Sequence, residues 1–384
     1  MVSGNSTLAG ARLRIGMVGG GPGAFIGGVH RIALQMDGQF ALVAGAFSSD
    51  AAKSRQTGAE LGLEPARTYA SWTEMLDAEA KLPAEKRIHA LSIVTPNHVH
   101  FGPAKAALER GFHVICDKPL SITVEEAEEL ERLVAKTKLR FCVTHNYTGY
   151  PMVRHARNLV QSGRLGTIRK VYVEYLQGWL SDRLEATGQK QAAWRSDPKQ
   201  SGACGAMGDI GTHAANLAEH LTGSRLDSLY AQLTTFVPGR VLDDDGMVLF
   251  KLKNGANGTL AASQVCVGRE NALSIRLFGT QGGLQWEQEK PNDLLVWWKD
   301  KAPELYRPGN GWIDDEAKTL QRVPAGHPEG YLEAFANLYR SFARAIRGES
   351  DIASAYPSVS DGLAGMKFLR ACVKSSKENG WVTL

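Results

Sequence analysis

The stretch LRIGMVGGGPGAFIGG, residues 13–28, decides the fold of the first part of this 384-residue chain. Leu13–Val18 is a short apolar run of strand-forming residues, and residues 28–36 place apolar side chains at helical spacing. In the glycine cluster between them, Gly19 and Gly21 would form the turn, and Gly27 or Gly28 would lie under the helix. Glycines let a backbone approach a pyrophosphate, to which the helix N-terminus offers free N–H groups. The pattern predicts a dinucleotide-binding turn, about three residues longer than the usual G-x-G-x-x-G spacing, with a merely flexible loop as the alternative.

The second strand, Phe40–Phe47, ends without the acid that normally holds the ribose hydroxyls, because Phe47 occupies its place and Asp50 is displaced. We expect Ser49 to cap a helix over residues 50–61. Basic and hydroxyl side chains at this point would suit a 2′-phosphate, so the choice between NAD and NADP stays open. These side chains are Ser48, Ser49, Lys53 and Arg55.

Strands and helices continue to alternate, with short connections, as far as His145. Such alternation predicts a parallel sheet with helices on both faces, which is a doubly wound Rossmann domain over residues 1–146. Thr123 and Glu126 have the spacing of a capping box before one of these helices. The further strands are expected at 90–94, 112–116 and 141–144, and the further helices at 71–80, 99–110 and 125–137.

The pattern changes after Tyr150, where several strand-like runs follow one another with few helices between them. This predicts an α+β domain over residues 147–384, built on a largely antiparallel open sheet. Residues 178–208 form a long irregular stretch, which is unusual in a compact domain unless it is functional. The expected strands include 168–177, 246–253, 258–267 and 273–278, and the expected helices are 152–162, 209–221, 330–347 and 361–377.

The composition argues against several classes of protein. A formal net charge of +4 without a dense basic block argues against binding of nucleic acid or a membrane surface. No apolar run is long enough to span a bilayer, and the N-terminal residues lack the apolar core of a signal peptide. The five cysteines are scattered and form no CxxC pair, which argues against a disulfide framework or a zinc site. A reducing, cytoplasmic location is the expectation.

Three further motifs follow the glycine turn in order: TPNHVH at Thr95–His100, CDKP at Cys116–Pro119, and GAMGDIGTH at Gly205–His213. Together they resemble the glucose–fructose oxidoreductase / inositol dehydrogenase family, also called Gfo/Idh/MocA, over nearly the whole chain. The longer glycine turn, the missing ribose acid and Asp117 in place of the family's usual glutamate are departures from its pattern. The resemblance implies an NAD- or NADP-dependent oxidoreductase.

The resemblance implies a catalytic trio of Lys118, Asp209 and His213. Oxidation of a secondary alcohol needs a base near neutral pKa, which suits His213, and a donor that stabilises the developing alkoxide, which suits Lys118. Asp209 precedes His213 by four residues, so on a helix the two side chains would share a face. A core histidine and an ordinary loop lysine are the structural alternatives. The predicted cofactor-binding residues are Gly19, Gly21, Pro22, Gly23, Ala24, Phe25, Ile26, Ser48, Ser49, Lys53, Thr95, Pro96, Asn97, His100, Asp117, Lys118 and Asn146.

The substrate is predicted to contact the trio together with Trp194, Arg195, Tyr147 and His327. An indole stacks on a sugar face and a guanidinium binds hydroxyls, although for Trp194, Tyr147 and His327 packing or capping is an equal alternative. We expect a dehydrogenase of a sugar, sugar derivative or polyol such as inositol. An NAD-dependent glycosidase that oxidises transiently and a non-catalytic sensor are the alternatives. The resemblance also implies a homodimer or homotetramer, and no metal is expected.

Overall fold

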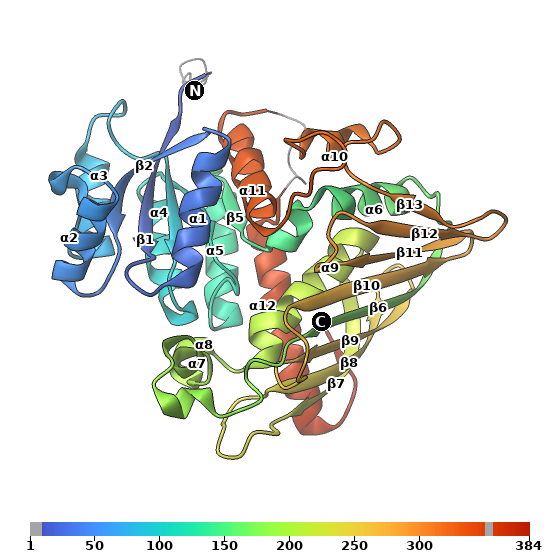
Figure 1. Ribbon diagram of the computed structural model, residues 1–384. Helices are drawn as coiled ribbons and strands as arrows, with labels where there is room; N and C mark the ends of the chain where they lie inside the picture. The colour runs from blue at the N-terminus through green and yellow to red at the C-terminus, as the bar shows by residue number, and fades with distance from the viewer. Residues whose placement is uncertain (1–9, 350–355) are drawn as a thin grey trace. The chain divides into compact units, whose positions relative to one another are not determined.

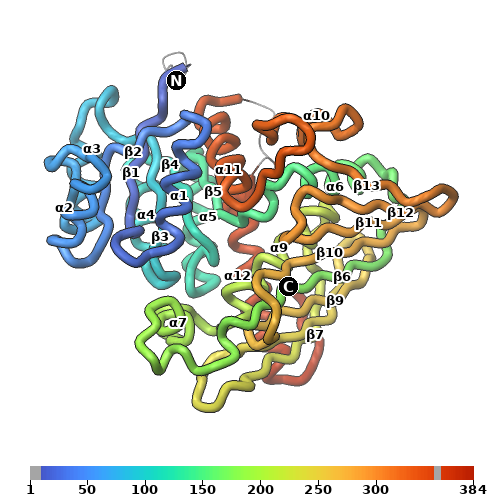
Figure 2. The backbone as a smooth tube through the Cα atoms, viewed as in Figure 1, coloured from blue at the N-terminus to red at the C-terminus, as the bar shows by residue number. Residues whose placement is uncertain are grey.

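The computed structural model describes residues 10–349 and 356–384, and they fall into two compact units (Figures 1 and 2). The first unit runs to Asn146 and also contains Leu332–Leu363. The second unit contains Tyr147–Tyr331 and Ala364–Leu384. The sequence had placed all residues after 146 in one domain, whereas the structure groups Leu332–Leu363 with the first unit.

The described part of the first unit is built on a five-stranded parallel sheet in the order β2-β1-β3-β4-β5. This confirms the predicted Rossmann topology. The strands are β1 (Leu13–Gly19), β2 (Phe40–Ala46), β3 (Ala90–Val94), β4 (His113–Cys116) and β5 (Phe141–Val143). The helices are α1 (Phe25–Met36), α2 (Ala51–Glu60), η1 (Pro65–Arg67), α3 (Trp72–Lys81), η2 (Asn97–Val99), α4 (Phe101–Glu109), α5 (Val124–Thr137) and α11 (Tyr331–Ile346).

Helix α11 completes the core of the first unit beside α1. Tyr339 of α11 places its hydroxyl 2.7 Å from Nδ1 of His30 on α1 and 2.9 Å from the hydroxyl of Ser92 on β3. Its ring also meets Phe40 edge-on, and Phe342 stacks on the same phenylalanine. Right-handed crossovers put α3, α4 and α5 on the opposite face of the sheet, where α4 contacts both of its neighbours.

The described part of the second unit is built on a nine-stranded sheet in the order β13-β12-β11-β10-β6-β9-β8-β7-β14. Every pairing is antiparallel except that of β6 with β9, which confirms the predicted α+β class. The strands are β6 (Ile168–Leu176), β7 (Leu226–Thr234), β8 (Asp245–Leu252), β9 (Asn257–Ser263), β10 (Ala272–Gly279), β11 (Gly282–Glu287), β12 (Leu294–Trp298), β13 (Glu304–Tyr306) and β14 (Val382–Thr383).

Helices α6 and α9 contact each other and pack along one face of this sheet (Figure 1). The strand β8 shows why the sheet has two different faces, since buried Val248 and Phe250 alternate with exposed Met247 and Leu249. The predicted homodimer or homotetramer stays a prediction, which the mass of the protein in solution would check. The helices are η3 (Asn146–Gly149), α6 (Pro151–Gln161), η4 (Leu184–Thr187), α7 (Lys190–Arg195), α8 (Pro198–Ser201), η5 (Met207–Gly211), α9 (Thr212–Thr222), α10 (Asp315–Thr319) and α12 (Val359–Glu378).

Two local expectations need correction. The N-cap of α2 is Asp50 and not Ser49, because the Asp50 carboxylate accepts hydrogen bonds from the backbone N–H groups of Ala52 and Lys53. The stretch 178–208 is also not wholly irregular, since α7 and α8 lie within it. The predicted cap of α5 is confirmed, because the Thr123 hydroxyl accepts from the N–H of Glu126 at 3.2 Å.

Candidate active site

The turn between β1 and α1 has the geometry of a phosphate cradle that only glycine can form. Gly19, Gly20 and Gly23 have φ angles of 87°, 78° and 75°, in the left-handed region. A Cβ on Gly19 would lie 2.7 Å from the carbonyl oxygen of Val94, and one on Gly27 would lie 2.3 Å from the Cα of Gly20. The glycine under the helix is therefore Gly27, since a Cβ on Gly28 would meet nothing within 4 Å.

The remaining residues of the turn lie at its surface. Pro22 and Gly23 are exposed, and the Phe25 side chain at the start of α1 is 67% exposed. The N–H of Gly21 donates to the carbonyl of Phe47 at 3.0 Å, and the N–H of Ala24 donates to Gly21 at 3.1 Å. These bonds fix the turn against the end of β2. The side chains of the turn are small, so its backbone stays accessible.

The end of β2 offers no uncommitted acid of the kind that usually holds the ribose. Phe47 is buried, and its N–H donates to the Ser54 hydroxyl at 3.0 Å. The exposed Asp50 caps α2, and its two backbone donors lower the pKa of its carboxyl. Lys53 and Ser49 are exposed beside it, and the Ser48 hydroxyl accepts from the N–H of Asp50 at 3.1 Å.

The buried polar atoms of the first unit without a hydrogen-bond partner among the described residues include Oγ1 of Thr95, directly after β3, and Nδ2 of Asn146, shortly after β5. Both follow the carboxyl ends of parallel strands, where open α/β sheets bind their ligands. Because a buried polar atom normally has a partner, these two atoms fit contacts with a bound nucleotide. The glycine cradle and the two atoms together fit a dinucleotide.

Lys118 follows β4 in a loop that Asp117 holds in place. Oδ1 of Asp117 accepts the N–H of Lys118 at 3.0 Å and the hydroxyl of Thr144 at 2.8 Å. The N–H of Asp117 also donates to Ile93 on the neighbouring strand at 3.0 Å. The shorter acid at this position therefore ties the lysine loop to the segment after β5. Pro96 and Asn97 of the neighbouring loop lie at the start of η2, where Asn97 is buried.

In the second unit, Asp209 lies on a π-helical turn, η5, that runs into α9. The helix expected from residue 209 is present, but its first turn is π-helical, and π turns frequently mark functional sites. Buried Asp243 accepts the N–H groups of Gly205 and Met207 at 2.7 and 2.8 Å, which secures the start of the segment. Asp209 and His213 follow on this turn and the next.

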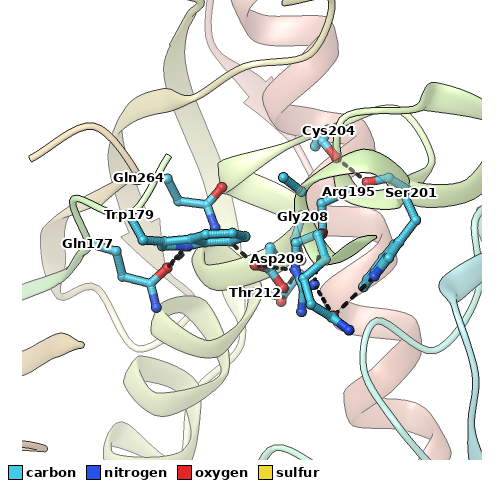
Figure 3. A network of polar contacts seen from close by, with 12 residues as sticks. Gln177, Trp179, Arg195, Ser201, Cys204, Gly208, Asp209, Thr212 and Gln264 are labelled. Carbon is cyan, nitrogen blue, oxygen red and sulfur yellow. Dashed lines mark hydrogen bonds and ion pairs between the residues drawn. The ribbon is translucent and has the colours of Figure 1, made fainter. Parts of the chain in front are cut away.

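Asp209 is held by two donors that reach the same oxygen, as Figure 3 shows. Arg195 Nε lies 3.0 Å from Oδ2, and Gln264 Nε2 lies 2.9 Å from it. Arg195 is itself fixed, since its Nη1 donates to the backbone and side-chain oxygens of Gln191 at 3.1 and 2.8 Å. Its guanidinium carbon lies 4.2 Å from the ring centroid of Trp194, which is a close cation–π contact.

The network continues through neutral groups that the sequence did not single out. Gln177 Oε1 accepts from Trp179 Nε1 at 3.0 Å and from Gln264 Nε2 at 3.3 Å. Gln177 Nε2 donates to Oδ1 of Asn271 at 2.8 Å. Gln177 follows β6 and Gln264 follows β9, so the parallel pairing of these strands brings both amides to one edge. No sequence pattern revealed that pairing.

His213 is buried against a pair of tyrosines. The Tyr147 ring meets its imidazole edge-on at 4.7 Å between centroids, and the Tyr175 ring lies at 6.2 Å. The two tyrosine hydroxyls are hydrogen-bonded to each other, and that of Tyr175 donates to Asn271 at 2.6 Å. Burial raises the pKa of Tyr147. Tyr147 therefore packs against the imidazole of His213 and is itself held by Tyr175, a residue of the same unit.

Some of the predicted residues of the second unit contact one another, and one lies in an exposed loop. Within the second unit, Trp194, Arg195 and Asp209 form one connected group. His327 is exposed in the loop before α11, where its Nδ1 lies 3.2 Å from the carbonyl of Pro324. Among the described residues no group of three or more His, Cys, Asp or Glu side chains is placed to hold a metal ion. No helix in the described ranges has the length and apolarity needed to cross a membrane.

Comparison with known proteins agrees with this geometry. The model of the oxidoreductase family with an NAD-binding Rossmann fold, Gfo/Idh/MocA, matches residues 13–145, and the model of the Gfo/Idh/MocA C-terminal domain matches residues 153–285. An oxidoreductase of known structure from Sinorhizobium meliloti is 45% identical, with a TM-score of 0.88 over 97% of this chain and 99% of that chain.

Two further relatives carry more specific names. An inositol dehydrogenase homolog from Azotobacter vinelandii, solved in complex with NAD+, is 36% identical with a TM-score of 0.93 over 100% of both chains. The levoglucosan dehydrogenase of Pseudarthrobacter phenanthrenivorans is 28% identical over 96% of this chain and 97% of its own length.

A Rossmann unit with a glycine cradle, joined to a unit with an open mixed sheet, defines a nicotinamide-dependent oxidoreductase. This chain belongs to the Gfo/Idh/MocA family, and its first domain is the family's NAD-binding domain.

Proposed function

We propose that this protein oxidises a secondary hydroxyl of a sugar, sugar derivative or polyol to a ketone, with NAD or NADP as the hydride acceptor. The observation that carries the proposal is the group around Asp209 and His213 in the second unit. A carboxylate and an imidazole follow one another on the η5–α9 helix, beside amides and indoles that suit a polyhydroxylated ligand. The names of the levoglucosan and inositol relatives support the same substrate class.

Each member of the proposed trio has one task. His213 takes the hydroxyl proton as general base, since an imidazole titrates near working pH. Lys118 donates a hydrogen bond to the reacting oxygen and stabilises its developing negative charge. Asp209 binds a neighbouring hydroxyl and is kept in one orientation by Arg195 and Gln264. A bound nicotinamide would supply the acceptor for the hydride of the carbinol carbon.

The first unit is proposed to bind the dinucleotide with the residues that its fold places at the carboxyl ends of the strands. The turn from Gly19 to Ile26 holds the diphosphate, and Ser48, Ser49 and Lys53 lie at the ribose end. Thr95, Pro96, Asn97 and Asn146 contact the nicotinamide half, where two of them present buried atoms without a described partner. Trp194, Arg195, Tyr147 and His327 remain the proposed substrate contacts in the second unit.

A screen of sugars and polyols with NAD and with NADP, followed by the absorbance of the reduced nicotinamide, tests the function. We expect net accumulation of reduced cofactor with at least one polyhydroxylated substrate. Loss of turnover in Lys118→Ala and His213→Asn, with cofactor still bound, would support the trio. Lys86→Ala is the matched control, because Lys86 is an exposed lysine of the same unit. Absence of signal with every substrate and both cofactors would contradict the proposal, and turnover without net reduction would favour the glycosidase.

A further inference from the structure

His100 bridges two loops of the first unit through both of its ring nitrogens. Nδ1 lies 2.8 Å from the carbonyl oxygen of Pro119, in the loop that carries Lys118. Nε2 lies 2.8 Å from the carbonyl oxygen of Thr95, in the loop after β3. The side chain is fully buried, at 0% exposure, so water does not replace either contact. His100 therefore joins the two loops that follow neighbouring parallel strands.

Both partners of His100 are carbonyl oxygens, which can only accept hydrogen bonds. This restricts the number of protons that the imidazole can carry. A neutral imidazole has one N–H and one lone pair, so it donates at only one nitrogen. Its other nitrogen would then face a carbonyl oxygen at 2.8 Å, with lone pair against lone pair. Only the imidazolium form, which has an N–H at each nitrogen, donates to both oxygens.

The charges around His100 act in opposite directions. Burial is the largest influence and leaves the pKa of His100 below its ordinary value, and the nearby Lys118 ammonium adds to the lowering. The Asp117 carboxylate and the carbonyl oxygens of Pro119 and Thr95 raise it. The carboxylate belongs to the same loop as Lys118 and is fixed by Thr144, so a compensating negative charge lies close to the ring.

We propose that His100 is a positioning residue that carries a proton on both ring nitrogens and clamps the lysine loop to the loop after β3. The clamp fixes the backbone on either side of Lys118, since Asp117 holds one side and Pro119 the other. Its effect on catalysis rests on the proposed function, whereas its proton count does not.

His30 provides an internal contrast in the same unit. It is also fully buried, but its Nδ1 faces the Tyr339 hydroxyl, which can donate as well as accept. Its Nε2 has no hydrogen-bond partner among the described residues, and burial lowers its pKa to about 4. A neutral imidazole therefore meets the hydrogen-bonding needs of His30. The two histidines are equally buried, but His30 carries one ring proton and His100 is proposed to carry two.

Nitrogen NMR of full-length protein labelled with 15N-histidine tests the proton count directly. At neutral pH we expect both ring nitrogens of His100 to have protonated shifts, while His30 shows one protonated and one unprotonated nitrogen. The signals of His100 are assigned by their loss in His100→Gln. An unprotonated nitrogen on His100 at neutral pH would overturn the proposal.

The kinetic arm compares His100→Gln with His98→Gln, which changes an exposed histidine two residues away. A shift of the lysine loop misplaces Lys118, so we expect kcat to fall by about a hundredfold in His100→Gln and to stay unchanged in His98→Gln. Unchanged kcat in a folded His100→Gln that still binds NAD would reject the positioning role. If the unaltered protein oxidised no polyol, the proposed function would fail while the NMR result would still decide the proton count.

Discussion

Arg195 and Asp209 form an ion pair in which the arginine Nε lies 3.0 Å from Oδ2 of the carboxylate. The arginine lies on α7 and the aspartate on the π turn η5, so the pair fixes two otherwise separate segments of the second unit. Both side chains are only partly exposed, at 24% and 16%, which limits solvent screening of the interaction.

The first prediction concerns this pair. Arg195→Met should lower kcat/KM by about ten- to a hundredfold, because Asp209 loses a charge-assisted donor that holds its orientation. Arg195→Lys should recover only part of the loss, since an ammonium does not reproduce the fork that binds Gln191 and Asp209 together. Steady-state kinetics would measure both. Arg307→Met, which breaks an exposed ion pair with Asp293, is the control and should leave kcat/KM unchanged.

The second prediction uses two adjacent glycines of α1. Gly27→Ala should destabilise the protein by about 2 kcal/mol and weaken NAD binding, because its Cβ would lie 2.3 Å from the Cα of Gly20. Gly28→Ala should be neutral or stabilising by about 0.5–1 kcal/mol, since its Cβ would meet nothing within 4 Å and alanine favours the helix. Thermal unfolding and NAD titration measure both variants. Equal stability and equal NAD affinity of the two variants would refute the close approach of Gly27 to Gly20.

The third prediction concerns Tyr147. Tyr147→Phe keeps the ring against His213 and removes the hydroxyl bond to Tyr175, so it should cost about 1 kcal/mol of stability with kcat nearly unchanged. Tyr147→Leu removes the ring and should lower kcat clearly. Chemical unfolding and steady-state kinetics measure the two effects. A large rise of KM in Tyr147→Phe would instead show that the hydroxyl binds substrate.

The fourth prediction is a pH dependence at the start of α2. The backbone donors of Ala52 and Lys53 lower the pKa of Asp50 in the folded state below its unfolded value. The ionised cap therefore stabilises the protein above the unfolded pKa, and the stabilisation is lost as the pH falls through the folded pKa. Asp50→Asn keeps a capping side chain without the charge. Its stability should fall below that of the unaltered protein near neutral pH and approach it in acid, as urea unfolding would show.

The sequence predicted the fold class because the decisive signals are local. The glycine cluster, the strand–helix alternation and the Thr123 cap each involve residues close together in the chain. The α2 cap was misassigned by one residue, since both Ser49 and Asp50 are good capping residues and only the backbone geometry decides between them.

Less of the candidate site was predictable. Asp209 was predicted from its motif and Arg195 from its place in the long stretch before that motif, but their contact depends on the fold of α7 and the π turn. Gln177, Gln264 and Asn271 carried no motif, and they meet only because β6 pairs in parallel with β9 and antiparallel with β10. Such long-range pairing leaves no periodic trace in any one strand.

The return of Leu332–Leu363 to the first unit determines when that unit can be completed during synthesis. A ribosome that has released residues 1–146 has made every strand of the parallel sheet but not α11. The nascent sheet would therefore expose Phe40 and leave His30 and Ser92 without Tyr339 until α11 has been translated. A gene fragment ending at residue 146 would encode an aggregation-prone protein, and a nucleotide-binding module for biotechnology should carry α11 as well.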